Sequence, residues 1–140
     1  MREVNGIYGG EMSAHHYFRE FGYCDSGMIP WLLLCDMICS QNRTLAEMLD
    51  ERIARFPVSG EINTQVADTA AAISRVEEHF SALPHEMDRC DGLGMDFGEW
   101  RFNLRGSNTE PLLRLNVESR GDQALMEQHR DEILELIRQP

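Results

Sequence analysis

The sequence contains no lysine, so all 13 of its basic residues are arginines. They are outnumbered by 24 acidic residues, which gives a formal net charge of −11 at pH 7. This balance argues against a general binder of nucleic acid, because phosphate backbones are held by basic surfaces. The sign reverses in residues 100–121, which hold four arginines and two glutamates. We interpret the segment as one suited to a small anionic ligand, although ordinary scatter of arginines would give the same count.

Long hydrophobic runs and paired cysteines are also missing. The most apolar stretch, residues 28–39, contains Pro30 and Asp36 and is shorter than the roughly 20 residues that span a bilayer. We therefore read it as a buried helix. None of the four cysteines forms a C-x-x-C pair, no histidine lies at zinc-ligand spacing, and the N-terminus lacks the apolar run of a signal peptide. We expect reduced, buried thiols, no membrane partner and a cytoplasmic location.

Two domains are predicted, with a boundary where Phe56-Pro57 ends a helical pattern. The first, residues 1–57, begins with an irregular segment that reaches about Tyr23. Two helices follow, one that ends near Ser40 and one that Thr44 can cap. The earlier helix is apolar on nearly all sides, so other structure must cover it.

The second domain, residues 58–140, reads as β-α-β-β-β-α. The strongest signals are the strict alternations W-R-F-N-L-R and L-L-R-L-N-V-E, each typical of a half-buried strand. The other expected elements are a strand at 62–66, a helix capped by Asp68, an interrupted strand at 89–97 and a final helix capped by Asp122. These predict an α+β fold whose antiparallel four-stranded sheet carries both helices on one face.

The two alternating strands are joined by R-G-S-N-T-E-P at residues 105–111. An arginine fork, hydroxyls and an amide offer many hydrogen-bond donors in one turn, which is what a phosphate dianion needs. The donors belong to Arg105, Ser107, Asn108 and Thr109. The alternative is a plain turn, because Ser, Asn, Thr and Gly are the usual turn residues.

This motif resembles the phosphate-binding loop of the α-D-phosphohexomutases. A second motif, G-G-E-M-S-A-H at residues 9–15, resembles the sugar-binding loop of the family's third domain, with Ala14 in place of the usual glycine. The stretches C-D-S-G-M-I-P-W and W-R-F-N-L-R-x-S-N-T-E-P look most like the bacterial phosphomannomutase branch. The resemblance covers essentially the whole chain.

The resemblance implies that residues 1–57 are the helical C-terminal part of the family's third, α/β domain. Residues 58–140 would be its complete fourth domain, a TATA-box-binding-protein-like fold. The implied parent activity interconverts mannose 6-phosphate and mannose 1-phosphate for GDP-mannose synthesis. A dual-specificity phosphoglucomutase/phosphomannomutase and a stand-alone phosphosugar-binding module are the alternatives.

The family's phosphoserine motif and its D-x-D-x-D magnesium motif are not in this sequence. The resemblance therefore assigns Mg²⁺ and hexose 1,6-bisphosphate to other domains of a parent enzyme, and no catalytic residue or metal ligand to this chain. We expect the chain alone to be inactive, with the phosphosugar and the parent's N-terminal domains as its partners.

By motif position, Glu11 and Ser13 would hydrogen-bond the 3- and 4-hydroxyls of the sugar, and His15 would contact the substrate or its phosphate. The phosphate that is not transferred would be held by Arg105, Ser107, Asn108 and Thr109. Without the resemblance, Glu11 and His15 would be ordinary solvated loop residues. Neighbouring arginines such as Arg114 could enlarge the positive face or simply pair with glutamates, so they are not assigned to the site.

Overall fold

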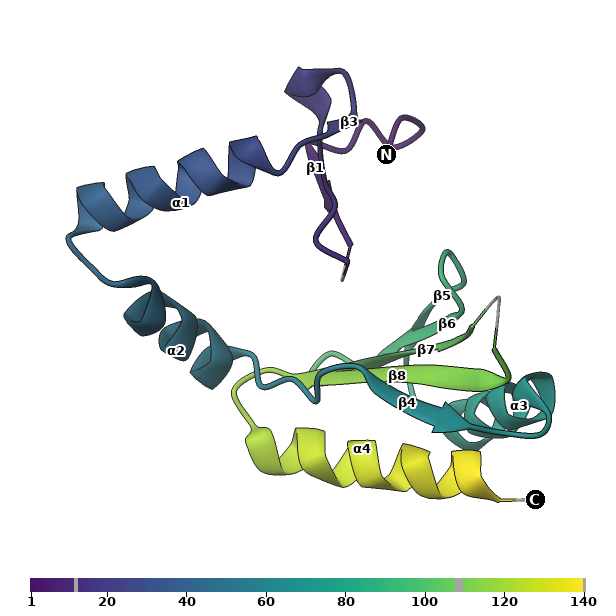
Figure 1. Cartoon of the computed structure of the whole chain (residues 1–140). Helices are drawn as coiled ribbons and strands as arrows, with labels where there is room; N and C mark the ends of the chain where they lie inside the picture. The colour runs from purple at the N-terminus through teal and green to yellow at the C-terminus, as the bar shows by residue number, and fades with distance from the viewer. Residues whose placement is uncertain (12, 108–109, 140) are drawn as a thin grey trace. The chain divides into compact units, whose positions relative to one another are not determined.

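We describe the chain from a computed structural model, which covers residues 1–11, 13–107 and 110–139. The chain divides into two compact units, Met1–Leu49 and Asp50–Pro140 (Figure 1). The domain boundary predicted between Pro57 and Gly60 stays a prediction.

The first unit begins with a small antiparallel sheet in the order β1-β2-β3. Its strands are Tyr8–Gly10, His16–Phe18 and Cys24–Asp25, and a short 3₁₀ helix, Arg19–Phe21, follows the second strand. Gly22, at a φ of 65°, turns the chain back toward β3. The prediction of an irregular segment up to Tyr23 is therefore wrong, because these strands are too short to show a period of two.

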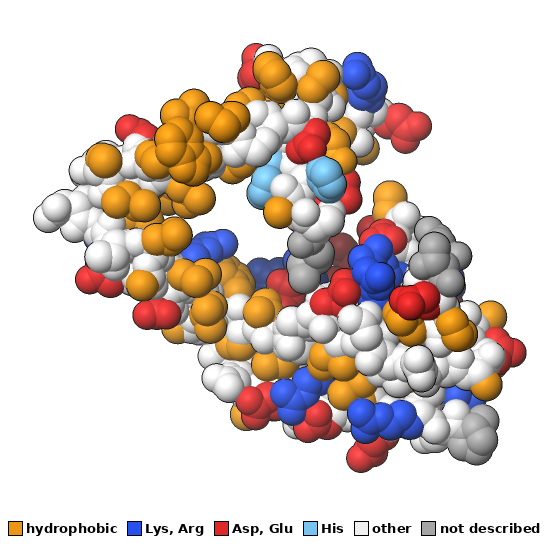
Figure 2. All heavy atoms as spheres, in the orientation of Figure 1, with side chains coloured by type: hydrophobic (Ala, Val, Ile, Leu, Met, Phe, Trp, Pro, Cys, Tyr) orange, Lys and Arg blue, Asp and Glu red, His pale blue; other side chains and the backbone are white. Residues whose placement is uncertain are grey.

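Two helices follow, α1 (Met28–Gln41) and α2 (Leu45–Arg55), close to their predicted positions. A capping box starts α2, because the Glu47 backbone N–H donates to Thr44 Oγ1 at 3.2 Å and the Thr44 backbone N–H donates back to Glu47 Oε2 at 2.8 Å. No residue of α1 is buried, and Figure 2 shows hydrophobic side chains crowded over it. The predicted burial of this helix is therefore not met within the described part of the chain.

The cysteines differ from expectation as well. All four are free thiols, but Cys24, Cys39 and Cys90 are exposed and Cys35 is only half-buried. Exposure of Cys39 follows from its place on α1, whose apolar surface is open. No helix among the described residues is both long and apolar enough to cross a membrane.

The second unit is one antiparallel sheet in the order β4-β8-β7-β6-β5 (Figure 1). The strands are Ile62–Gln65 (β4), Glu86–Asp88 (β5), Leu93–Asp96 (β6), Trp100–Gly106 (β7) and Leu112–Ser119 (β8). The α+β class is confirmed, but the described sheet has five strands where four were predicted. Of the interrupted strand expected at 89–97, β6 forms, and the residues before it make a turn through Gly92, at a φ of 83°, that joins β6 to the unpredicted strand β5.

The helices α3 (Thr69–Phe80) and α4 (Gln123–Arg138) lie on the same face of the sheet (Figure 1). The predicted caps form, with Asp68 accepting from the Ala71 N–H and Asp122 from the Leu125 N–H. Alternate residues of the strands pack with the helices into one core. Its fully buried side chains include Val76, Phe80, Leu93, Leu104, Leu113, Leu115, Val117, Ile133 and Ile137. The other face of β7 and β8 therefore carries the polar residues of the alternation.

Candidate functional site

The sugar-binding motif forms the loop of the β1–β2 hairpin. The Glu11 N–H donates to the His15 carbonyl and the Ala14 N–H donates to the Glu11 carbonyl, both at 3.0 Å. Ala14 has a φ of 64°, in the left-handed region that glycine adopts most easily. This conformation gives a physical reason for the family's usual glycine, and it costs Ala14 about 1 kcal/mol. Met12 lies outside the described residues.

The Glu11 carboxylate is held by two hydroxyl groups. Tyr17 donates to Glu11 Oε1 at 2.6 Å, and Ser13 donates to Oε2 at 3.1 Å. These hydrogen bonds, that from Tyr17 foremost, lower the pKa of Glu11. Glu11 is therefore an ionised acceptor at neutral pH, which is the chemistry that binds sugar hydroxyls.

His15 is held by a carboxylate from the third strand. Its Nδ1 lies 2.6 Å from Asp25 Oδ2, and the pKa of His15 is raised mainly by this hydrogen bond and then by the charge of Asp25. Asp25 Oδ1 accepts from the His16 backbone N–H at 2.8 Å. The structure thus brings Glu11, Ser13 and His15 together, and it adds Tyr17 and Asp25, which the motif did not indicate.

The phosphate-binding motif joins β7 to β8 in the second unit. The Ser107 N–H donates to the Leu112 carbonyl at 2.9 Å, which closes the loop. Of the predicted residues, Arg105 and Ser107 are described, while Asn108 and Thr109 lie outside the described residues. The two described residues are therefore placed at the end of β7, as the sequence predicted.

Arg105 is not a free guanidinium group. It lies 3.4 Å from Glu61 Oε2 and 3.5 Å from Asp91 Oδ2. Arg114, the cross-strand partner of Arg105, lies 3.5 Å from the other oxygen of Glu61. Glu61 therefore bridges two arginines on the sheet face that the helices leave open. This bridge could not be predicted from the sequence, because it depends on the pairing of β4 with β8.

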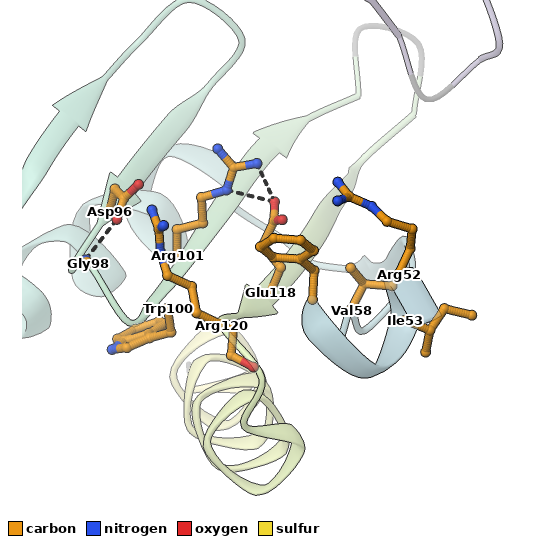
Figure 3. A pocket seen from close by; sticks show the side chains of 11 residues that line it. Arg52, Ile53, Val58, Asp96, Gly98, Trp100, Arg101, Glu118 and Arg120 are labelled. Atoms are coloured by element: carbon orange, nitrogen blue, oxygen red, sulfur yellow. Dashed lines mark hydrogen bonds and ion pairs between the residues drawn. The ribbon is translucent and has the colours of Figure 1, made fainter. Parts of the chain in front are cut away.

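A pocket of about 470 Å³ lies elsewhere in the second unit (Figure 3). Its lining includes Arg52, Val58, Trp100, Arg101, Glu118 and Arg120. In Figure 3 Arg101 points to Glu118, and their ion pair measures 2.7 Å. Neither Arg105 nor Ser107 lines this pocket, so it carries no part of the predicted site.

Nowhere among the described residues do three His, Cys, Asp or Glu side chains gather in an arrangement that could hold a metal. The assignment of Mg²⁺ to other domains of a parent enzyme stays a prediction, and we derive no step through the ion.

Two family descriptions match the chain. "Phosphoglucomutase/phosphomannomutase, alpha/beta/alpha domain III" matches residues 1–56, and "Phosphoglucomutase/phosphomannomutase, C-terminal domain" matches residues 61–136.

Curated relatives agree over almost the full chain. The chain is 61% identical to a phosphomannomutase of Salmonella montevideo and 58% identical to one of Escherichia coli K12, with 98% of the chain covered in each case. It is also 58% identical to a protein of Xanthomonas campestris pv. campestris named "Phosphohexose mutases", over 99% of the chain. The chain spans about 30% of the length of the first two relatives and 31% of the third.

A solved structure shows the same fold. It is a phosphoglucomutase/phosphomannomutase family protein of Burkholderia thailandensis, with a TM-score of 0.67 and 21% identity over 97% of this chain and 29% of that one. From the two matching family descriptions and these relatives, we conclude that the chain belongs to the phosphoglucomutase/phosphomannomutase family.

Proposed function

We propose that this chain belongs to a phosphomannomutase that interconverts mannose 6-phosphate and mannose 1-phosphate, in which it supplies recognition of the sugar and its phosphate. The observation that carries the proposal is the pair of complementary site groups within one chain. One group is the ionised carboxylate of Glu11 with its neighbours, which accepts from hydroxyls. The other is the arginine of the β7–β8 connection, which binds anions.

In this proposal Arg105 and the loop that follows it bind the phosphate that is not being transferred. Binding energy from such a remote group positions the reacting end of the substrate, so it serves the rate as well as the affinity. The nucleophile and Mg²⁺ would come from other parts of a parent enzyme, and this chain alone would be inactive. The GDP-mannose pathway, the hexose 1,6-bisphosphate requirement and the cytoplasmic location also stay predictions.

A second candidate is a mutase that accepts both mannose and glucose phosphates. Mannose and glucose share the 3- and 4-hydroxyls, so Glu11 and Ser13 would not distinguish them. The relative from Xanthomonas campestris, which is named for phosphohexoses in general, is as similar to the chain as the Escherichia coli K12 phosphomannomutase. Mutase assays of a full-length enzyme carrying this sequence, with both sugars, separate the two candidates.

The test on the chain itself is a titration with mannose 1-phosphate, followed in proton–nitrogen correlation spectra. We expect shifts in the Glu11–His15 hairpin and at Arg105 and Ser107. Arg105→Gln should weaken binding about tenfold or more, because it removes a charge-assisted contact to the phosphate. Arg101→Gln is the matched control on the same strand, since Arg101 pairs with Glu118. It should bind as the wild type does.

Two results would refute the assignment. One is a set of shifts confined to the pocket around Trp100, with none at either motif. The other is equal binding by the Arg105→Gln and wild-type chains. The sequence upstream of this chain in its parent protein distinguishes an enzyme from a stand-alone binding module. An enzyme must carry the phosphoserine and magnesium motifs there, and a binding module would lack them.

A further inference from the structure

Asp25 joins two parts of the sugar-binding hairpin through its two oxygens. Oδ2 lies 2.6 Å from His15 Nδ1, and Oδ1 accepts from the His16 N–H at 2.8 Å. The strand ladder fixes Asp25 independently, because it is the register partner of Tyr17 and because the Ser26 N–H donates to the His16 carbonyl. A carboxylate that is fixed by one backbone N–H, on a residue whose main chain is held in the strand ladder, is a preorganised partner for the His15 ring.

This contact decides which nitrogen of His15 carries a proton. An ionised carboxylate only accepts hydrogen bonds, so Nδ1 of His15 must be the donor. The remaining ring nitrogen, Nε2, makes no hydrogen bond within the described residues, and the His15 side chain is 53% exposed. Nε2 is therefore the atom that a ligand meets. It is an acceptor when the ring is neutral and a charged donor when the ring is protonated.

Three side chains lie near His15, and two of them affect its charge. Asp25 lies on β3, Glu11 is in the same hairpin loop, and the Tyr17 ring lies 6.5 Å away between ring centroids. Both carboxylates favour the protonated ring, with the larger effect from Asp25. Glu11 is itself occupied by Tyr17 and Ser13. The hairpin thus places the His15 ring, whose pKa is raised, beside the carboxylate of Glu11, whose pKa is lowered.

We propose that Asp25 is a positioning residue, which holds His15 in its Nδ1–H form and directs Nε2 at an oxygen of the bound phosphosugar. This inference rests on the proposed function, because it concerns the same hairpin. In this proposal Asp25 holds the His15 ring through Oδ2 and the backbone of His16 through Oδ1, and it makes no direct contact with the ligand. Its effect on binding would pass entirely through His15.

The first test needs no ligand. Long-range proton–nitrogen spectra of the histidine rings report tautomer and pKa, and they should show Nδ1–H and a raised pKa for His15. Asp25→Asn should lower the pKa of His15 and mix its tautomers. His16 is a control within the same chain, because its ring contacts the Tyr8 hydroxyl and not Asp25. Tyr17→Phe is a second control, which frees Glu11 and leaves the His15 tautomer in place.

The second test measures affinity for mannose 1-phosphate. Asp25→Asn should weaken binding about tenfold, as expected for one misdirected hydrogen bond to a charged group. In a His15→Ala background the same substitution should have no further effect, because the residue through which Asp25 acts is gone. If Asp25 only stabilised the fold of the hairpin, Asp25→Asn would weaken binding in both the wild-type and the His15→Ala backgrounds.

The outcomes separate this inference from the proposed function. An unchanged His15 tautomer in Asp25→Asn, or unchanged affinity despite a changed tautomer, would overturn the inference and leave the function standing. Failure of the wild-type chain to bind mannose 1-phosphate would count against the function, and the tautomer result would still decide the role of Asp25. If Asp25→Asn unfolds the hairpin, Asp25→Glu keeps the charge, and it should restore the Nδ1–H tautomer.

Discussion

Replacing Glu61 with glutamine should destabilise the second unit, because it removes the shared partner of two arginines. Glu61 lies 3.4 Å from Arg105 and 3.5 Å from Arg114, which are directly opposite each other on β7 and β8. Among the residues that the structure describes, Arg105 then keeps only Asp91 as an ion-pair partner, and the Asp91 side chain is 71% exposed and therefore contributes little. After the substitution, two like charges face each other across the strands with no carboxylate between them.

The size of the effect follows from exposure and distance. The Glu61, Arg105 and Arg114 side chains are 23%, 30% and 34% exposed, so each ion pair is partly screened by water. Their separations are also longer than those of a well-formed charge-assisted hydrogen bond. Two such pairs, together with the uncovered repulsion, amount to about 1–2 kcal/mol. For a unit of this size, that lowers the thermal midpoint by about 5–10 °C.

Fluorescence of Trp100 reports unfolding of this unit, since Trp100 is 6% exposed while Trp31 is already 56% exposed. Glu118→Gln is the matched control, because Glu118 pairs with the single cross-strand Arg101. We expect it to cost under about 1 kcal/mol. Equal losses in the two variants would refute the reasoning, as would a Glu61→Gln loss that does not shrink in about 0.5 M NaCl. Phosphate should raise the midpoint of Glu61→Gln more than that of the wild type.

Two further predictions concern stability. Burial raises the pKa of Glu132, but hydrogen bonds from His79 and His129 bring that pKa below its ordinary value. The contribution of Glu132 to the free energy of unfolding is therefore fully present above its unfolded-state pKa, and it is lost as the pH falls through its folded-state pKa. The difference in urea midpoint between wild type and Glu132→Gln should therefore vanish between about pH 5 and pH 3, and a constant difference would contradict this. Gly92→Ala would place Cβ 2.6 Å from a backbone oxygen of β7 at a φ of 83°, and we expect a loss of at least about 3 kcal/mol in the free energy of unfolding. Gly98→Ala, at a φ of 88° in open space, should cost only about 1–2 kcal/mol, so equal losses would show that the close contact is unimportant.

The second unit was largely predictable because its strands are long and half-buried. In Trp100–Gly106 every second side chain enters the core, so burial itself produces the alternation that the sequence displays. The caps Asp68 and Asp122 are local chemistry, decided within three residues, and both form as predicted. Strand β5 escaped prediction because all three of its residues are exposed, which leaves no periodic signal.

The small sheet of the first unit could not be predicted for a similar reason. Strands of two or three residues cannot show a period, and their pairing depends on contacts between distant residues. Asp25 is ten residues from His15, and Tyr17 is six from Glu11. The motif therefore identified the residues expected to face the sugar, whereas their supports required the register of the strands.

Arg105 was likewise identified by its motif, whereas its carboxylate partners depend on the pairing of the strands. Under the proposed function, these partners affect how strongly Arg105 can bind a phosphate. Arg105 already has carboxylate partners, so a phosphate that reaches it replaces Glu61 and Asp91 instead of meeting a bare charge. Such an exchange gains less free energy than capture by an unpaired guanidinium group, because part of the interaction is given up. Under the proposed function, weak net binding would suit a site that must bind a phosphate and release it again. The Glu61→Gln variant separates these effects, since it should bind phosphate more tightly while the unit that carries the site becomes less stable.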